Sequence, residues 1–302
     1  MEQIRRFPNR LRTVAVIAAA LVLVTAGVAV ARNPNAIHII TPQKADQITN
    51  IDILRSEIKN YYGTPTATTG SSCDQYLVSP ANSNYSREAT KVARAGIRWL
   101  RAQANMPHTG TMAIVFDVDD TTLTTWNYEL CSNWDYNFTA NSVFVMDNLF
   151  PATPGMLNLA TKADKMGYAI FWITGRGTAQ YDATLANLVS DAYAGYTAPD
   201  PGQIDAGYPA PTMISLTGPG GVDEPGLFTK PDVADYPAYL QAACASDPGG
   251  KCTTIHYKSA TRAYIESQGF DIVASFGDQF SDLKGGYADR TFKMPNPNYY
   301  LP

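Results

Sequence analysis

Four short apolar runs that alternate with amphipathic segments constrain the fold of this chain more than any other feature of its sequence. The runs extend from Met112 to Phe116, Tyr168 to Ile173, Thr212 to Leu216 and Asp271 to Phe276. The intervening segments predict helices from Gly155 to Met166, Ala179 to Tyr193 and Ala260 to Gln268. Buried strands that alternate with helices are typical of a parallel sheet covered on both faces. We therefore predict an α/β fold with a doubly wound parallel sheet.

The 302 residues divide into a predicted sheet core and a shorter part that precedes it. We assign residues 111–302 to the core, with insertions at 123–151, which is rich in aromatic residues, and at 195–255, which is rich in Gly and Pro. Both insertions are expected to form small caps or loops. Residues 32–110 predict a helical segment that packs on the core. Its helices extend from Ile51 to Tyr62, stopped by Gly63, and from Ser86 to Ala104, with Ser86 as the N-cap.

The first 31 residues have the pattern of a secretory signal peptide. Four arginines precede an unbroken apolar run from Thr13 to Ala31, which ends in an A-x-A cleavage pattern. Cleavage after Ala31 predicts a secreted, periplasmic or cell-surface protein. The alternative is an uncleaved anchor, because a run of this length just spans a bilayer, and only then do we expect a membrane partner.

The charge balance argues against nucleic acid as a partner. Residues 1–31 hold four of the 23 basic and one of the 27 acidic side chains, so the remaining chain has a formal net charge of −7. Nucleic-acid backbones require clustered Lys and Arg, and no basic run follows the leader.

The cysteines of an exported chain are expected to form disulfides rather than a zinc site. They are even in number and none has the C-x-x-C spacing typical of zinc. Of three possible pairings we favour Cys244 with Cys252, which closes a short Asp-Pro-Gly-Gly turn and leaves Cys73 with Cys131. Two unbonded pairs are the alternative.

Three of the four apolar runs end in polar residues suited to phosphate and a hard cation. These residues are Asp117 and Asp119 after the first run, Thr174 and Arg176 after the second, and Asp278 and Asp282 after the fourth. Because the carboxyl ends of parallel strands meet at one edge of a sheet, we expect these side chains to converge there.

Two aspartates at a strand end predict covalent chemistry on phosphorus. One carboxylate attacks and forms an aspartyl phosphate, while the other protonates the leaving oxygen and later deprotonates water. An anionic phosphate reaches these acids only with positive charge nearby, and Mg²⁺ prefers such oxygen ligands. Asp278 is the best third carboxylate, and Asp282 is expected to orient the site from behind it.

Three residues are expected to hold the phosphate itself. Thr174 offers a hydroxyl donor, and Arg176 offers a forked contact. Lys258 offers a point charge just before the helix that Ser259 is expected to cap.

Some of these residues have an alternative interpretation. The Asp117 to Thr122 run resembles a calcium loop only in part, because it lacks the Gly at position six and the Glu at position twelve of an EF-hand. Asp120 is expected in the following turn as a solvated charge. Trp126 and Tyr128 are candidates for the entrance of a substrate pocket, and the alternative is that they pack a small cap.

The motifs together resemble the haloacid dehalogenase-like phosphatases, and within them the secreted acid phosphatases of plants and of bacterial classes B and C, a subgroup that includes vegetative storage proteins. The resemblance covers residues 110–302. It rests on segments 116–121, 173–176, 257–262, 277–283 and 290–297.

The resemblance implies a role for each position. Asp117 would be the nucleophile and a ligand of Mg²⁺, and Asp119 the acid and base, with its backbone carbonyl on the metal. Thr174 and Lys258 would bind the phosphoryl group. Asp278 would complete the metal site, with Asp282 behind it.

We therefore expect a secreted Mg²⁺-dependent acid phosphatase that hydrolyses small phosphate monoesters, with transfer to an alcohol as a related reaction. One rival is a secreted binding or storage protein with the same fold and no turnover. Some storage relatives have lost the nucleophile, whereas Asp117 is present here. A second rival is a calcium-stabilised surface module.

Overall fold

The computed structural model describes residues 41–67, 77–189 and 205–301. The predicted signal peptide lies outside these residues. The chain divides into two units, Met1–Asn50 and Ile51–Pro302. The described part of the first unit contains one 3-10 turn, η1 (Ala45–Gln47). All other elements belong to the second unit, and no described helix is long and apolar enough to cross a membrane.

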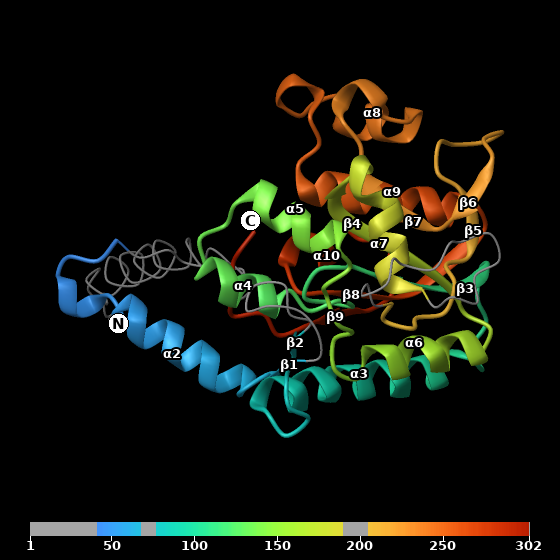
Figure 1. The fold of residues 1–302 in the computed structure, drawn as a ribbon. Helices are drawn as coiled ribbons and strands as arrows, with labels where there is room; N and C mark the ends of the chain where they lie inside the picture. Colours follow the sequence, from blue (N-terminus) through green and yellow to red (C-terminus); the bar gives the residue numbers. More distant parts are fainter. Residues whose placement is uncertain (1–40, 68–76, 190–204, 302) are drawn as a thin grey trace, which may run out of the picture. The chain divides into compact units, whose positions relative to one another are not determined.

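A five-stranded parallel sheet forms the centre of the second unit (Figure 1). Its order is β7-β4-β3-β8-β9, and every neighbouring pair is parallel. The bounds are β3 (Thr111–Phe116), β4 (Ala169–Gly177), β7 (Leu227–Lys230), β8 (Phe270–Gly277) and β9 (Thr291–Lys293). The predicted parallel sheet is confirmed. After β3 the chain adds β4 and β7 on one side and β8 and β9 on the other, so the strand order reverses beside β3. In open α/β sheets, ligands commonly bind at the carboxyl ends of the strands at such a reversal.

Alternate residues of β3 face opposite layers. Ile114 and Phe116 belong to the core beneath α3 (Asn84–Gln103) and α6 (Met156–Lys165). Ala113 and Val115 belong to the core on the other face, beneath α8 (Ala238–Cys244) and α9 (Thr254–Ser267). Figure 1 shows α3 and α6 on one side of the sheet and α9 on the other. Apolar residues on both faces explain why the strands are continuous apolar runs and not alternating ones.

The helices that precede the sheet follow the sequence closely. Helix α2 spans Ile51–Tyr62, as predicted, and Gly63 after it has a φ of +77°, which favours glycine. Helix α3 begins earlier than predicted, because Ser83 is its N-cap: its hydroxyl accepts from the backbone N–H of Ser86. The expected cap, Ser86, is instead buried in the first turn. Ser83 and Ser86 are three positions apart and are both suitable caps, so the sequence did not decide between them.

Helix α3 lies close to the sheet because of one glycine. A Cβ on Gly96 would lie 2.6 Å from Leu159 and 2.7 Å from Phe276, so no larger residue fits without displacing α6 or β8.

One predicted strand is outside the central sheet. The run from Thr212 to Leu216 forms β5 (Met213–Ser215), which pairs antiparallel with β6 (Asp223–Pro225). Thr212 contacts the edge of β4, where its backbone N–H donates to the carbonyl of Ile170 at 2.9 Å. The hairpin then turns away, and β7 takes the place beside β4. The run does form a strand, but its predicted place in the parallel sheet was wrong, because an apolar run does not specify its partner strand.

Two predicted helices have different bounds. The segment from Ala179 to Tyr193 forms η2 (Thr178–Gln180) and α7 (Tyr181–Leu188), and the end of the predicted helix lies outside the described residues. The segment from Ala260 to Gln268 belongs to α9, which begins at Thr254 with Thr253 as its N-cap, so Ser259 is not a cap. The segment 123–151 contains α4 (Trp126–Ser132) and α5 (Phe138–Met146). The remaining short elements are β1 (Thr66–Ala67), β2 (Leu77–Val78), η3 (Val233–Asp235), η4 (Pro248–Gly250) and α10 (Phe280–Leu283).

Candidate active site

The carboxyl ends of β3 and β8 place acidic side chains together. Asp117 directly follows β3, and its backbone N–H donates to the carbonyl of Phe276 on β8 at 2.9 Å. Asp278 directly follows β8, and Asp282 lies on α10. Carboxylate oxygens of Asp117, Asp278 and Asp282 lie within 4.8 Å of one another, and all three residues are buried. We call these three residues the acidic cluster.

Lys258 reaches the acidic cluster from α9, the helix that covers the Ala113 and Val115 face of the sheet. It lies in the second turn of α9, not before a helix as the sequence predicted. Its Nζ is 2.5 Å from Asp117 Oδ1 and 2.6 Å from Asp282 Oδ1, and its side chain is 5% exposed. Among the residues that the structure describes, it is the one cationic side chain paired with the acidic cluster.

The acidic cluster therefore holds three buried carboxylates, and the one ammonium group pairs with two of them, Asp117 and Asp282. Burial raises the pKa of Asp117 to about 7, although Lys258 acts in the opposite direction. Burial, together with the negative charges of Asp282 and Asp117, raises the pKa of Asp278 well above its ordinary value. Burial opposes the charge of Lys258, but the two carboxylates raise its pKa above the usual range. The cluster has an excess of negative charge that a cation relieves.

The donor set fits a hard divalent cation. Each member of the acidic cluster offers a carboxylate oxygen, and the three oxygens are close enough to coordinate one ion. Hard cations such as Mg²⁺ and Ca²⁺ prefer oxygen ligands of this kind.

Asp119 faces a different partner. Its carboxylate accepts two hydrogen bonds from Arg176, from Nη2 at 2.6 Å and from Nε at 3.0 Å. The third donor of Arg176, Nη1, reaches the hydroxyl of Thr184 at 3.0 Å. The guanidinium is 4% exposed and the Asp119 side chain 30% exposed, so a buried fork holds a carboxylate that solvent reaches.

Thr174 is fully buried near the end of β4. Its hydroxyl accepts from the backbone N–H of Arg176 at 3.2 Å, which turns the side chain toward the strand end. Thr174 and Arg176 therefore belong to the same strand end as predicted, but Arg176 contacts Asp119 in this structure.

Asp120 is not a solvated charge, and that prediction was wrong. It is fully buried with a φ of +51°. Its carboxylate accepts from the hydroxyl and the backbone N–H of Thr125, at 2.6 and 3.1 Å. Burial raises its pKa to about 6. Asp120 thus closes the loop after β3, because the left-handed backbone turns its side chain inward, which sequence patterns do not show.

Three residues that the sequence analysis did not single out contact Asp278. The hydroxyl of Thr121 donates to Oδ1 at 3.3 Å. The side-chain amides of Gln279 and Asn296 donate to Oδ2 at 2.6 and 2.7 Å. Asn296 lies in the segment 290–297 that carried part of the family resemblance, and this was the one signal in the sequence that marked it.

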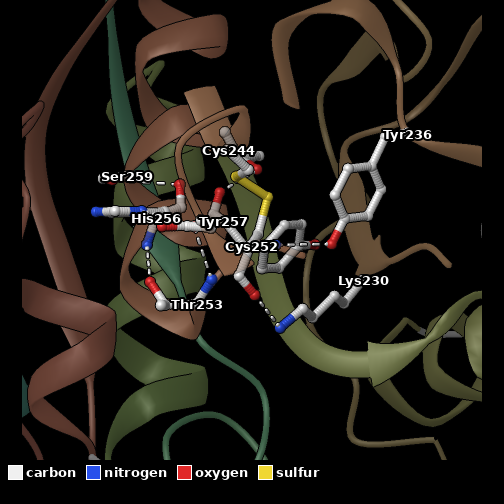
Figure 2. The surroundings of a disulfide bond; sticks show 10 residues. Lys230, Tyr236, Cys244, Cys252, Thr253, His256, Tyr257 and Ser259 are labelled. Carbon is white, nitrogen blue, oxygen red and sulfur yellow. Dashed lines mark hydrogen bonds and ion pairs between the residues drawn. A yellow bond between two sulfur atoms is a disulfide. The ribbon is translucent and has the colours of Figure 1, made fainter. Parts of the chain in front are cut away.

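A disulfide supports the start of α9, on which Lys258 lies. The predicted pair Cys244 and Cys252 is bonded, with Cα atoms 5.0 Å apart. Figure 2 shows Lys230 and Tyr236 around Cys252: Lys230 donates to its carbonyl at 3.1 Å, and the hydroxyl of Tyr236 accepts from its N–H at 3.2 Å. The next residue, Thr253, caps the helix through the N–H of His256. These contacts position the helix that carries the ammonium group.

The second predicted disulfide, between Cys73 and Cys131, includes a residue that the structure does not describe. Cys131 is disulfide-bonded, but Cys73 lies outside the described residues. This pairing stays a prediction.

Trp126 and Tyr128 pack inside the protein. Each is 1% exposed. Trp126 stacks on Tyr62 with ring centroids 4.1 Å apart, and it borders a cavity at the end of α2 that none of the carboxylates line. Tyr128 packs edge-on against Phe144 of α5. The packing alternative therefore describes both side chains, because a ring of α2 covers Trp126 and a ring of the insertion covers Tyr128.

Comparison with known proteins gives one family. The model for the HAD superfamily, subfamily IIIB (Acid phosphatase), matches residues 39–199 and 241–302. This match includes the helices before residue 110, which the resemblance in the sequence did not cover. It omits residues 200–240, which lie within the predicted insertion at 195–255.

Individual proteins give a consistent result. Acid phosphatase 1 of Solanum lycopersicum is 26% identical over 231 residues, which cover 75% of this chain and 72% of that protein. The stem 28 kDa glycoprotein of Glycine max is 28% identical over 192 residues, which cover 62% of this chain and 59% of that protein. Vegetative storage protein 1 of Arabidopsis thaliana is 44% identical over 54 residues, or 18% of this chain and 20% of that protein.

The fold also matches a solved structure. The class C acid phosphatase from Bacillus anthracis superimposes with a TM-score of 0.50 and 19% identity, covering 72% of this chain and 80% of that one. At this identity the match concerns the fold.

Proposed function

The chain belongs to subfamily IIIB of the HAD superfamily, the acid phosphatases, and from this premise we propose that it hydrolyses small phosphate monoesters through an aspartyl phosphate on Asp117. The observation that carries the proposal is the acidic cluster with Lys258 at its centre. A buried group of three carboxylates and one ammonium, at the switch point of a parallel sheet, is costly for folding and is explained by chemistry on an anionic substrate.

The proposed reaction has two displacements. In the first, the Asp117 carboxylate attacks phosphorus, the bond to the leaving oxygen breaks, and Asp119 donates a proton to that oxygen. In the second, Asp119 takes a proton from water, the resulting nucleophile attacks phosphorus, and inorganic phosphate leaves with the Asp117 carboxylate restored. Asp119 suits this exchange because it is the partly exposed acid of the loop.

Other residues of the chain position the two reacting acids and the phosphoryl group. Lys258 already contacts Asp117, so its ammonium lies where charge develops on the transferring group. The Thr174 hydroxyl is assigned to a phosphoryl oxygen. Arg176 is assigned to Asp119 instead of the phosphate, because its donors are directed to Asp119 and Thr184.

The acidic cluster is the proposed metal site. Asp117, Asp278 and Asp282 would hold Mg²⁺, with the backbone carbonyl of Asp119 as a further ligand. The ion supplies positive charge that lowers the repulsion between substrate and carboxylates. The sequence placed Asp282 behind the site. We instead propose it as a direct ligand, because its carboxylate lies in the acidic cluster.

The test is Asp117→Asn, assayed with an aryl phosphate and Mg²⁺. We expect turnover to fall by at least about 10³-fold, because the nucleophile is lost. Asp164→Asn on the exposed face of α6 is the matched control. Undiminished turnover of Asp117→Asn relative to this control would refute the proposal.

A storage or binding protein is the second candidate, because two of the relatives carry the names of a storage protein and a stem glycoprotein. It predicts that the purified chain binds a divalent cation but releases no phosphate from any of a panel of aryl, sugar and nucleoside phosphates.

We also propose that the protein is exported with its leader removed after Ala31. The bonded pair Cys244 and Cys252 supports this, because disulfides persist in oxidising compartments. N-terminal sequencing of the protein from its native host tests it: a mature chain that begins at Arg32 is expected, and a chain that retains residues 13–31 would show the anchor instead.

A further inference from the structure

The C-terminal segment of the chain returns to the acidic cluster. After β9, the backbone N–H of Met294 donates to the carbonyl of Gly277 at 2.8 Å, directly beside Asp278. Residues 296–301 then run past Asp278 and Gln279, with contacts from Asn296, Tyr299 and Leu301. We call residues 296–301 the C-terminal strap.

Two side-chain amides meet at one oxygen of Asp278. Gln279 Nε2 donates to Oδ2 at 2.6 Å and Asn296 Nδ2 donates to the same oxygen at 2.7 Å. Two hydrogen bonds of this length occupy the lone pairs of that oxygen.

Backbone groups of the strap fix the direction of both amides. The Oδ1 of Asn296 accepts from the backbone N–H of Asn298 at 2.8 Å, so its NH₂ group must face the carboxylate. The Oε1 of Gln279 accepts from the backbone N–H of Leu301 at 3.0 Å, so its NH₂ group faces the same way. A flipped amide would place its oxygen against the Asp278 carboxylate, two acceptors together, and its NH₂ group against a backbone N–H, two donors together.

The other oxygen of Asp278 has a weaker contact. Oδ1 accepts from the hydroxyl of Thr121 at 3.3 Å, which is long for a bond between oxygens. The amides therefore hold the carboxylate by Oδ2 and leave Oδ1 to the acidic cluster.

The choice of amides also suits the charge of the site. Asn296 Nδ2 lies 3.5 Å from Asp120 Oδ2 as well as 2.7 Å from Asp278, so it separates two buried carboxylates. A lysine ammonium in this place would repel a metal ion bound by the acidic cluster. The neutral amide of Asn296 satisfies the carboxylate oxygens without repelling that ion.

The middle of the strap is anchored to other parts of the chain. Asn298 donates to the hydroxyl of Tyr62 on α2 at 3.0 Å, and its Oδ1 accepts from the indole N–H of Trp134 at 3.3 Å. The strap is thus held between α2, the loop after α4 and the acidic cluster.

We propose that the C-terminal strap is part of the metal site, with Asn296 as a positioning residue that holds Asp278 by one oxygen and directs the other to the cation. This inference rests on the proposed function, because it assumes that the acidic cluster binds a divalent ion. It assigns a role to a segment about 180 positions away from the nucleophile in sequence.

The test measures Mn²⁺ binding by electron paramagnetic resonance, on the full chain and without substrate. Asn296→Ala is expected to weaken binding by about 10- to 100-fold, as loss of a group that orients a ligand does. The melting temperature in EDTA should stay within a few degrees of the parent, and activity should return at high Mg²⁺. The matched control is Asn158→Ala on the exposed face of α6.

A second variant tests the same inference if Asn296→Ala does not fold. Gln279→Met keeps the length of the side chain, removes its amide, and should weaken binding in the same direction. Equal Mn²⁺ affinity of either folded variant and the Asn158→Ala control would overturn the strap but leave the proposed function intact. If the parent chain binds no Mn²⁺, both the metal site and the strap fail. If the parent chain binds Mn²⁺ and the Asn296→Ala variant binds it more weakly, but the parent shows no turnover, only the proposed function is contradicted.

Discussion

Removal of the Lys258 ammonium is the most informative single change in this protein. Lys258 is buried and forms two short ion pairs, with Asp117 and Asp282. Lys258→Met keeps most of the side-chain volume and removes the charge. The acidic cluster then loses the cationic side chain that pairs with two of its three carboxylates.

The expected loss of stability follows from burial. Breaking a buried ion pair by removal of one partner costs about 3–5 kcal/mol, because the remaining charge is left in a medium that solvates it poorly. For a domain of this size, 1 kcal/mol corresponds to about 2–4 °C in melting temperature. We therefore expect Lys258→Met to melt about 6–20 °C below the parent in EDTA.

Mg²⁺ should reduce this difference. A divalent cation among the carboxylates replaces the missing charge, and in the variant it no longer faces the ammonium. Mg²⁺ should therefore raise the melting temperature of Lys258→Met more than that of the parent. Turnover should still fall by about 10²–10³-fold, because charge on the transferring phosphoryl group has lost a donor.

The assay is differential scanning fluorimetry across a Mg²⁺ titration, beside aryl phosphate turnover. Lys165→Met on the exposed end of α6 is the matched control. If Lys258→Met and this control melt within about 2 °C of each other in EDTA, the carboxylates are not charged together in the folded protein and the reasoning fails.

Three further outcomes are expected. His108 is hydrogen-bonded to the Gln103 carbonyl and to Asp271, and these contacts raise its pKa above the ordinary value of a histidine. The stabilisation that they give is complete below the ordinary pKa and is lost as pH rises through the raised pKa. His108→Gln should therefore lower the melting temperature at about pH 5 and have little effect at about pH 9, and equal losses at both would contradict this. Replacing both bonded cysteines, eight positions apart, by serine should cost about 2–3 kcal/mol in urea unfolding and lower turnover through α9, whereas an unchanged unfolding midpoint would exclude a stabilising role. A Cβ on Gly277 would lie 2.2 Å from Asp282, so Gly277→Ala should displace that carboxylate and weaken Mn²⁺ binding, and normal affinity would argue against Asp282 as a ligand.

Local patterns in the sequence were sufficient for part of the fold. The apolar runs before Asp117 and Asp278 predicted two strands of a parallel sheet, because burial on both faces requires continuous apolar residues, and the structure shows them as neighbours. Helix α2 was predicted to the residue by its amphipathic spacing and its terminal glycine. The Cys244 and Cys252 pair followed from a short turn that brings the two residues together.

Tertiary contacts decided the parts that local patterns leave open. Which strand lies beside β4 depended on a hairpin that turns away from the sheet, so β7 and not β5 is the strand that joins the five-stranded sheet at this edge. The burial of Trp126 depended on Tyr62, a residue of another helix. The inward direction of Asp120 depended on a left-handed backbone at one position.

The acidic cluster shows both contributions. The types and order of its residues were evident in the chain, because each follows an apolar strand and the ends of parallel strands converge. Its completion required partners that are far apart in sequence, such as Lys258 and Asp117, separated by 141 positions, and Thr121 and Asp278, separated by 157. Local sequence determines where a strand ends and which side chain stands there, but only the folded chain decides which distant donors can reach a buried carboxylate.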